Sequence, residues 1–243
     1  MTTPKMIIFD YGGTLFYEPD FDWLRGEKAV FTHVIKNPYN VTAEDIYNFN
    51  ERIFGDAQIA RDNNFELHHF QMLKMKYEYF LIELDISFEE AEWILWNNIS
   101  PANEKCFMPN AKAMLAYLKN KNIRSGIISN MGWSGNALTK RINSIMPDNN
   151  FEFIIASSEY CYRKPEPLLF ELALRKAGLK AEDVWFCGDT FNADITGAHN
   201  AGIFPVYYQG KVEDGPSRKP LLNQPDFDFL TIDDWNQLID HLI

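Results

Sequence analysis

Polar side chains that could do chemistry stand directly after several short apolar runs of the chain. In chain order, these side chains are Asp10, Ser129, Asn130 and Asp189. A cation, Lys164, follows another such run, and Asp194 stands five residues after Asp189. Two carboxylates at that spacing, across a loop that enters a helix, can converge with Asp10 on one hard cation. Mg²⁺ prefers oxygen ligands at about 2.0–2.1 Å, so the pattern predicts a magnesium site.

The apolar runs themselves predict a parallel sheet. Each run is short and almost uninterrupted, as in strands that lie buried between two layers of helices. The predicted strands are 6–9, 125–128, 153–156, 184–187 and 203–208. Helical patterns alternate with them at 111–120, 166–176, 194–200 and 235–242. This alternation predicts an α/β core with a doubly wound parallel sheet, in which ligands bind beyond the carboxyl ends of the strands.

One long interval, between Asp10 and Ile123, contains no predicted strand. Apolar residues recur there at helical spacing, and Thr42 and Ser87 are predicted to be helix N-caps. The predicted helices are 23–36, 43–61, 65–83 and 88–96. The sequence therefore predicts two domains, which are an α/β core domain of residues 1–17 and 100–243 and a helical cap domain of residues 18–99.

Composition and charge argue against two classes of partner. Lys and Arg number 23 against 34 for Asp and Glu, so the formal net charge is −11. Proteins bind nucleic acids and anionic membrane surfaces through an excess of Lys and Arg side chains, which this chain lacks. No apolar stretch approaches the roughly 18 residues of a membrane span, and no signal-peptide pattern opens the chain. The three cysteines (Cys106, Cys161 and Cys187) show no disulfide or zinc spacing. A cytoplasmic protein with packed, unpaired cysteines is expected.

Four short motifs follow one another along the chain. The first is Asp10-Tyr11-Gly12-Gly13-Thr14 after a strand, and the others are Ser129, Lys164-Pro165, and Gly188-Asp189 with Asp194. In this order, and on these predicted elements, they resemble the motifs of the haloacid dehalogenase-like (HAD) hydrolase superfamily. The insert stands where members of the type 1 class carry a helical cap. The resemblance covers nearly the whole chain and implies a Rossmann-like core with that cap.

The resemblance also implies a reaction and a role for each motif residue. Asp10 would be the nucleophile that attacks phosphorus and forms an aspartyl-phosphate, with Lys164 as a further catalytic residue that neutralises the phosphoryl group. Ser129 and Asn130 would bind the phosphoryl oxygens together with Lys164. The implied ligands of Mg²⁺ are Asp10, the backbone carbonyl of Gly12, Asp189 and Asp194. The implied protein is a Mg²⁺-dependent hydrolase of a small phosphorylated metabolite.

Gly12 departs from the family pattern. Phosphatases of the family have a second Asp at this position, which is the general acid for the leaving group and the base for water. General acid–base catalysis contributes about 10²–10⁴-fold to a rate, and glycine supplies none of it. A replacement acid could come from the substrate, from a good leaving group, or from Glu18, Asp20 or Asp22 in the segment that enters the insert.

Two other readings therefore stay open. One is a catalytically weak or inactive HAD-fold protein that binds Mg²⁺ and a phosphorylated ligand. The other is a HAD hydrolase that acts on a carbon–halogen or carbon–phosphorus bond. Family members that cleave carbon–phosphorus bonds use a cap lysine to form a Schiff base, but Lys74 and Lys76 of the insert are expected to point to solvent. Tyr11, beside the predicted nucleophile, is expected to be a packing residue.

Overall fold

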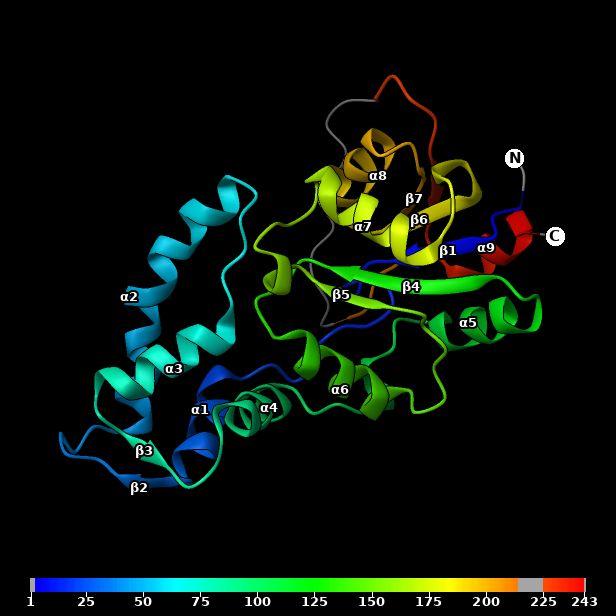
Figure 1. Cartoon of the computed structure of the whole chain (residues 1–243). Coiled ribbons are helices and arrows are strands. Elements are labelled where there is room, and N and C mark those ends of the chain that lie inside the picture. Colours follow the sequence, from blue (N-terminus) through cyan, green and yellow to red (C-terminus); the bar gives the residue numbers. More distant parts are fainter. Residues whose placement is uncertain (1–2, 214–224, 243) are drawn as a thin grey trace.

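The computed structural model describes residues 3–213 and 225–242, and its centre is a six-stranded sheet (Figure 1). The strands are β1 (Met6–Phe9), β4 (Arg124–Ser129), β5 (Ile154–Ala156), β6 (Val184–Gly188), β7 (Phe204–Tyr208) and β8 (Leu230–Ile232). They lie in the order β5-β4-β1-β6-β7-β8, and every neighbouring pair is parallel. The predicted doubly wound parallel sheet is confirmed.

Helices cover both faces of the sheet because successive residues of a strand point to opposite faces. In β1, Ile7 and Phe9 belong to one buried cluster, whereas Met6 and Ile8 belong to a second. The first cluster is closed by α5 (Ala111–Asn120), α6 (Gly135–Ile145) and α9 (Trp235–Leu242). The second is closed by α7 (Pro167–Ala177) and α8 (Gly197–Asn200). Figure 1 shows these two helical layers on either side of the strands.

Local signals account for most of the helix ends in this core. Helix α7 begins with Pro167 in its first turn and ends at Gly178, which has a φ of 63° as a left-handed C-cap requires. The predicted helix 194–200 is instead a π-helical turn, Phe191–Thr196, that continues into α8. Helix α6 was not predicted from the sequence, although Ser134 caps its first turn by accepting a hydrogen bond from Ala137 N.

The inserted segment, residues 18–99, lies to one side of the sheet in Figure 1 and is hereafter the insert. Its elements are α1 (Trp23–Phe31), β2 (Val34–Lys36), α2 (Ala43–Asp62), α3 (His69–Tyr79), β3 (Glu83–Leu84) and α4 (Phe88–Ile99). Both predicted N-caps, Thr42 and Ser87, form capping boxes with the acidic residue three positions later. The division into a core domain and a cap domain stays a prediction.

The expectation that the insert contains only helices is wrong at two places. Strands β2 and β3 pair antiparallel, where the predicted helices 23–36 and 65–83 should have ended. Val34 and Ile35 are β-branched and favour extended backbone. The following Asn37 precedes Pro38, which disfavours helical backbone at that residue. These two signals outweigh the helical periodicity and end α1 at Phe31.

The prediction that Lys76 points to solvent is also wrong. Its side chain is buried, and its ammonium pairs with the fully buried carboxylate of Glu27 on α1. The hydroxyl of Tyr77 lies 3.5 Å from the other carboxylate oxygen of Glu27. Lys74 is half exposed and pairs with Glu78, as expected for a surface lysine. A lysine on the inner face of an amphipathic helix finds a buried partner, because an unpaired buried charge is costly.

The three cysteines are unpaired and differ in exposure. All three cysteines are free thiols, and Cys106 and Cys187 are buried as expected. Cys161 is exposed, so the expectation that it is packed is wrong; it directly follows the short helix at 157–160. Across the described residues, no helix has the length and apolar character needed to cross a membrane.

Candidate active site at the carboxyl ends of the central strands

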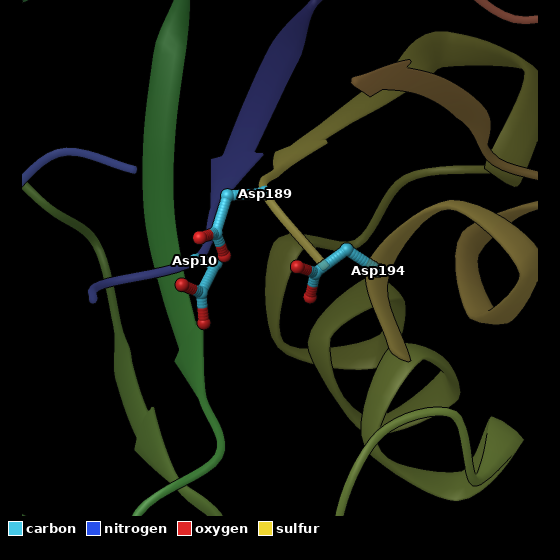
Figure 2. Close-up of side chains that lie close together, drawn as sticks. All are labelled: Asp10, Asp189 and Asp194. Atoms are coloured by element: carbon cyan, nitrogen blue, oxygen red, sulfur yellow. The ribbon is translucent and has the colours of Figure 1, made fainter. Parts of the chain in front are cut away.

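Three aspartates meet at the carboxyl end of the sheet, as Figure 2 shows. Asp10, Asp189 and Asp194 each offer a carboxylate oxygen, and these oxygens all lie within 4.8 Å of one another. Asp10 follows β1 and Asp189 follows β6, its hydrogen-bonded neighbour in the sheet. The backbone N–H of Asp10 donates to the carbonyl of Cys187 at 2.9 Å, which continues the pairing to the strand ends.

Asp194 reaches the other two aspartates from the π-helical turn after β6. Its carboxylate accepts a hydrogen bond from the backbone N–H of Thr190 at 2.8 Å, and its side chain is almost completely buried. The Asp194 side chain packs directly against Gly188, where the Cβ of any other residue would collide with it. The Gly-Asp motif therefore has a steric cause, because only glycine at the end of β6 leaves room for this carboxylate.

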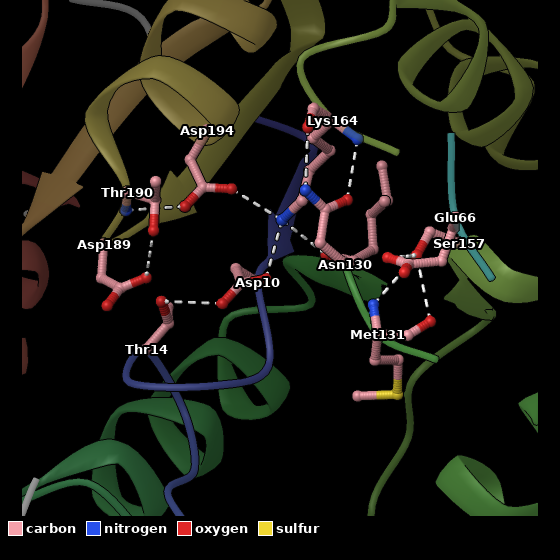
Figure 3. A network of polar contacts seen from close by, with 11 residues as sticks. Asp10, Thr14, Glu66, Asn130, Met131, Ser157, Lys164, Asp189, Thr190 and Asp194 are labelled. Carbon is pink, nitrogen blue, oxygen red and sulfur yellow. Dashed lines mark hydrogen bonds and ion pairs between the residues drawn. The ribbon is translucent and has the colours of Figure 1, made fainter. Parts of the chain in front are cut away.

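A buried lysine joins two of these aspartates (Figure 3). Lys164 Nζ lies 2.7 Å from Asp10 Oδ1 and 2.6 Å from Asp194 Oδ1, and it also donates to the carbonyl of Ile128 at 2.9 Å. Burial alone would lower the pKa of Lys164, but the two carboxylates outweigh that effect and raise it. Lys164 therefore stays charged at neutral pH and fixes the orientation of Asp10.

The remaining predicted binding residues lie beside Lys164. Ser129 is the last residue of β4, which neighbours β1 on the side opposite β6. The side-chain amide of Asn130 donates to the carbonyl of Lys164 at 2.8 Å and accepts from its backbone N–H at 2.7 Å. This pair of bonds holds the backbone at Lys164, a role that the sequence did not reveal for Asn130.

The charges of this cluster do not balance. Three carboxylates and one ammonium sum to −2 when all are ionised. The pKa of Asp10 is raised to about 7, chiefly by burial; the charges of Asp194 and Asp189 also raise it, whereas Lys164 lowers it. Thr14 Oγ1 lies 3.4 Å from the second oxygen of Asp10. A group of hard oxygen ligands with excess negative charge, two of them buried and Asp189 partly exposed, has the donor chemistry that Mg²⁺ requires.

The loop after Asp10 brings glycine backbone to the same place. Gly13 has a φ of 72°, a conformation that residues with a Cβ rarely adopt. Its N–H donates to the carbonyl of Phe16 at 2.7 Å, and Gly12 and Phe16 form a bridge, so the chain folds back on itself. A Cβ at Gly12 would meet no atom within 4 Å.

A cavity of about 600 Å³, the strand-end cavity, opens above these groups. Asp10, Gly12, Ser129, Asn130, Lys164, Asp189 and Asp194 all line it. Its walls also carry five aromatic side chains, which are Tyr11, Tyr17, Phe21, Trp96 and Trp133. Of the three acids considered as replacements at Gly12, only Glu18 is among the described lining residues. The structure thus brings every predicted site residue to one cavity.

Two lining features could not be found from the sequence. Trp96 from α4 of the insert stacks on Trp133 from the loop after β4, with ring centroids 4.9 Å apart and an interplanar angle of 8°. Tyr11 is buried as expected, and its hydroxyl accepts a hydrogen bond from Arg141 Nε at 2.8 Å. Both pairs join residues far apart in the chain, so no local spacing indicates them.

Two buried carboxylates of the insert contact residues outside the insert, in the loops that follow β4 and β5. Glu92 on α4 accepts from the backbone N–H of Ser134 at 2.9 Å and from its hydroxyl at 2.5 Å. Glu66, in the loop before α3, accepts from the hydroxyl of Ser157 at 3.1 Å and lies 3.3 Å from Arg163 Nη1. These contacts place the aromatic residues of the insert beside those of the core.

Comparisons with known proteins agree with this geometry. The chain is 28% identical to glyceraldehyde 3-phosphate phosphatase of Methanothermobacter thermautotrophicus, over 96% of this chain and 97% of that protein. It is 26% identical to the protein of the same name from Pyrococcus furiosus, over 84% of this chain and 80% of that one. The crystal structure of a HAD phosphatase from Thermococcus onnurineus has the same fold, with a TM-score of 0.60, 18% identity, and coverage of 98% and 97% of the two chains.

The family itself is shown by a match along most of the sequence. The profile described as "Haloacid dehalogenase-like hydrolase" matches residues 7–207, which include all four motifs and the whole insert. The resemblance found in the sequence is confirmed, and this chain belongs to the haloacid dehalogenase-like hydrolases.

Proposed function

We propose that this protein is a Mg²⁺-dependent phosphatase that hydrolyses a small phosphorylated metabolite through an aspartyl-phosphate at Asp10. The observation that carries the proposal is the meeting of Asp10, Asp189, Asp194 and Lys164 in one largely buried cluster, with Asp189 partly exposed. The names of the two archaeal relatives, both glyceraldehyde 3-phosphate phosphatases, support a substrate of this class.

Asp10 is placed to act as the nucleophile. Its carboxylate is 7% exposed and lines the strand-end cavity, so an oxygen can approach a phosphorus atom while solvent is largely excluded. Lys164 holds Oδ1 at 2.7 Å. A carboxylate that attacks an anionic phosphate meets like-charge repulsion, and an ammonium beside the reacting oxygen reduces that repulsion.

The residues present fit a bound Mg²⁺. Asp189 and Asp194 would hold the ion, with Asp10 and the backbone carbonyl of Gly12 as further oxygen ligands. The cluster supplies three carboxylates within 4.8 Å and a net charge of −2, which a divalent cation cancels. When bound, Mg²⁺ supplies positive charge against the phosphoryl oxygens.

The phosphoryl group would rest beside Asp10, among lining residues that follow β4 and β5. We assign its oxygens to the hydroxyl of Ser129 and the amide hydrogen of Asn130 that does not bond the Lys164 carbonyl, with the ammonium of Lys164 as the neighbouring positive charge. Aromatic walls enclose the rest of the cavity. A volume of about 600 Å³ accommodates a small metabolite and is within the usual range for ligand sites.

Gly12 favours one second candidate function. With no side chain at this position, the site could bind the metal and a phosphorylated ligand with little turnover. Nothing favours a hydrolase of carbon–phosphorus bonds, which would need a cap lysine in the site. Lys76 forms an ion pair with Glu27 and is not among the described residues that line the strand-end cavity. The acidic pair after β6 also gives no support to metal-free cleavage of a carbon–halogen bond.

Release of phosphate from a panel of small phosphate monoesters tests the proposal. We expect turnover with Mg²⁺, loss of turnover with a chelator, and loss of turnover in Asp10→Asn, which keeps the shape of the side chain. Asp148→Asn, which removes an exposed carboxylate in another loop, is the matched control and should behave as the wild type. Tight binding of Mg²⁺ and phosphate without turnover would favour the binding protein, and metal-independent chloride release from haloacids would favour a dehalogenase.

A further inference from the structure

We propose that Glu18 is the general acid and base of this active site, in place of the side chain that Gly12 lacks. The proposal rests on the phosphatase function proposed above. An alkyl phosphate leaves as an alkoxide, which is a poor leaving group unless a proton reaches its oxygen as the P–O bond breaks. Gly12 faces the strand-end cavity but carries no group that could supply this proton.

The fold of the chain after Asp10 brings Glu18 near Gly12. The bridge between Gly12 and Phe16 and the bond from Gly13 N–H to the Phe16 carbonyl turn the chain back along itself. Two residues of extended chain span at most about 7 Å, so Glu18 begins within that distance of the Phe16 backbone. Its side chain lines the same cavity as Asp10 and is 25% exposed.

The other titratable groups that line the cavity are less suited to donate the proton. Lys164 is paired with two carboxylates, and the aspartates form the proposed metal site. Arg163 carries a guanidinium, which is not deprotonated in proteins, and burial raises the pKa of Tyr11, which makes its hydroxyl a weaker acid. Asp20 and Asp22 are not among the described residues that line the cavity. Asp20 pairs instead with Arg25, and Asp22 caps α1. Tyr17 is the one competing acid among the described lining residues, and it is tested below.

The surroundings of Glu18 suit a group that must gain and lose a proton. Trp96 Nε1 donates to Glu18 Oε1 at 2.5 Å, and Arg141 Nε lies 4.0 Å from the same oxygen. Burial raises the pKa of Glu18, whereas Arg141 and the Trp96 hydrogen bond oppose that rise without cancelling it. In the described part of the chain, the contacts of Trp96 and Arg141 are both made to Oε1 of Glu18. Oε2 is therefore the oxygen that exchanges the proton.

The proposed steps balance in atoms and charge. Asp10 attacks phosphorus, the new O–P bond forms, and the electrons of the breaking P–O bond pass to the bridging oxygen, which takes the proton of Glu18. The product alcohol departs and leaves Glu18 ionised. Glu18 then takes a proton from water as the water oxygen attacks phosphorus, which frees Asp10 as a carboxylate and restores the protonated Glu18.

Glu18→Gln compared on two substrates tests this assignment. With an alkyl substrate such as glycerol phosphate, we expect kcat/KM to fall about 10²–10⁴-fold. With p-nitrophenyl phosphate, whose leaving group needs no proton, kcat/KM should change far less. The kcat for that substrate should still fall, because water attack also needs Glu18. A burst of one nitrophenolate per active site should then precede slow turnover.

Matched variants separate a chemical role from a structural one. Asp20→Asn removes a carboxylate from the same segment that enters the insert, and this variant should match the wild type on both substrates. Gly12→Asp in the Glu18→Gln background should recover alkyl-phosphate turnover, because a Cβ at position 12 meets no atom within 4 Å. Equal losses on both substrates in Glu18→Gln, or the leaving-group pattern in Tyr17→Phe instead, would overturn the assignment.

The same assays distinguish this inference from the proposed function. If Asp10→Asn is inactive while Glu18→Gln retains full alkyl-phosphate turnover, the role of Glu18 is wrong and the phosphatase stands. If Asp10→Asn retains turnover, the aspartyl-phosphate route is wrong. A wild type with Mg²⁺ that hydrolyses no member of the panel of phosphate monoesters, these two included, overturns both.

Discussion

The ammonium of Lys164 lies 2.7 Å from a carboxylate oxygen of Asp10, and the two residues are 154 positions apart in the chain. Both side chains are almost completely buried. The pair joins the end of β1 to the loop after β5, and it connects the stability of the fold with the chemistry of the cavity. Removing either partner should therefore change both properties.

Lys164→Gln should unfold more easily and lose phosphatase activity. Breaking a buried ion pair by removing one partner costs about 3–5 kcal/mol, and here it removes the cation that pairs with both Asp10 and Asp194. Denaturant titration and phosphate release measure the two effects. The control is Lys112→Gln, whose solvent-exposed pair with Glu104 should contribute little to stability. Equal stabilities of the two variants would contradict the structural role of Lys164.

Mg²⁺ should raise the thermal unfolding temperature. A ligand at 100 times its dissociation constant adds about 2.7 kcal/mol, which corresponds to roughly 5–10 °C for a chain of this size. Asp189→Asn should abolish most of that shift, because it removes a proposed ligand. Asp148→Asn removes the same charge from an exposed loop and should keep the shift. An unchanged Mg²⁺ response in Asp189→Asn would place the ion elsewhere.

The metal-free protein should lose stability as pH rises from about 4 to about 7. The pKa of Asp10 is about 7 in the folded state and 3.8 as its ordinary value. Within that window the folded protein keeps a proton that the unfolded chain has lost, so rising pH favours unfolding. Denaturant titrations in chelator should show this slope in the wild type and a smaller one in Asp10→Asn. Identical slopes would show that Asp10 ionises normally.

The buried pair in the insert gives a prediction that concerns stability alone. Lys76→Met should lower the free energy of unfolding by about 3–5 kcal/mol, because it leaves Glu27 buried and unpaired. Adding Glu27→Gln should recover part of the loss. Lys74→Met, at a half-exposed pair, should change little. Phosphatase activity of folded Lys76→Met should persist, and its disappearance would indicate a chemical role for Lys76.

The strands of the core were predictable because their residues are constrained on both faces. Ile7 and Ile8 point to opposite helical layers, so a buried parallel strand needs an unbroken apolar run that is visible in the sequence. The polar residue that ends such a run must lie at the sheet edge. The aspartates and Ser129 could therefore be placed together before their contacts were known.

The insert was less predictable because its decisive contacts are not local. Lys76 has the sequence context of a surface lysine, and only the tertiary packing of the insert helices brings it to Glu27 on α1. Helix α6 escaped prediction for a similar reason, since its buried Arg141 interrupts the apolar pattern. That arginine donates to Tyr11 and to the carbonyl of Ser100, partners that lie 130 and 41 positions away.

Chemical trapping of the phosphorylated enzyme tests the central claim most directly. The protein would be mixed with Mg²⁺ and substrate, quenched within one turnover and treated with borohydride, which reduces an aspartyl-phosphate to homoserine. Mass spectrometry of the peptide that contains residue 10 should find homoserine there, and Asp10→Asn should give none. Phosphate released at full rate while residue 10 remains an unmodified aspartate in every quenched sample would contradict the account.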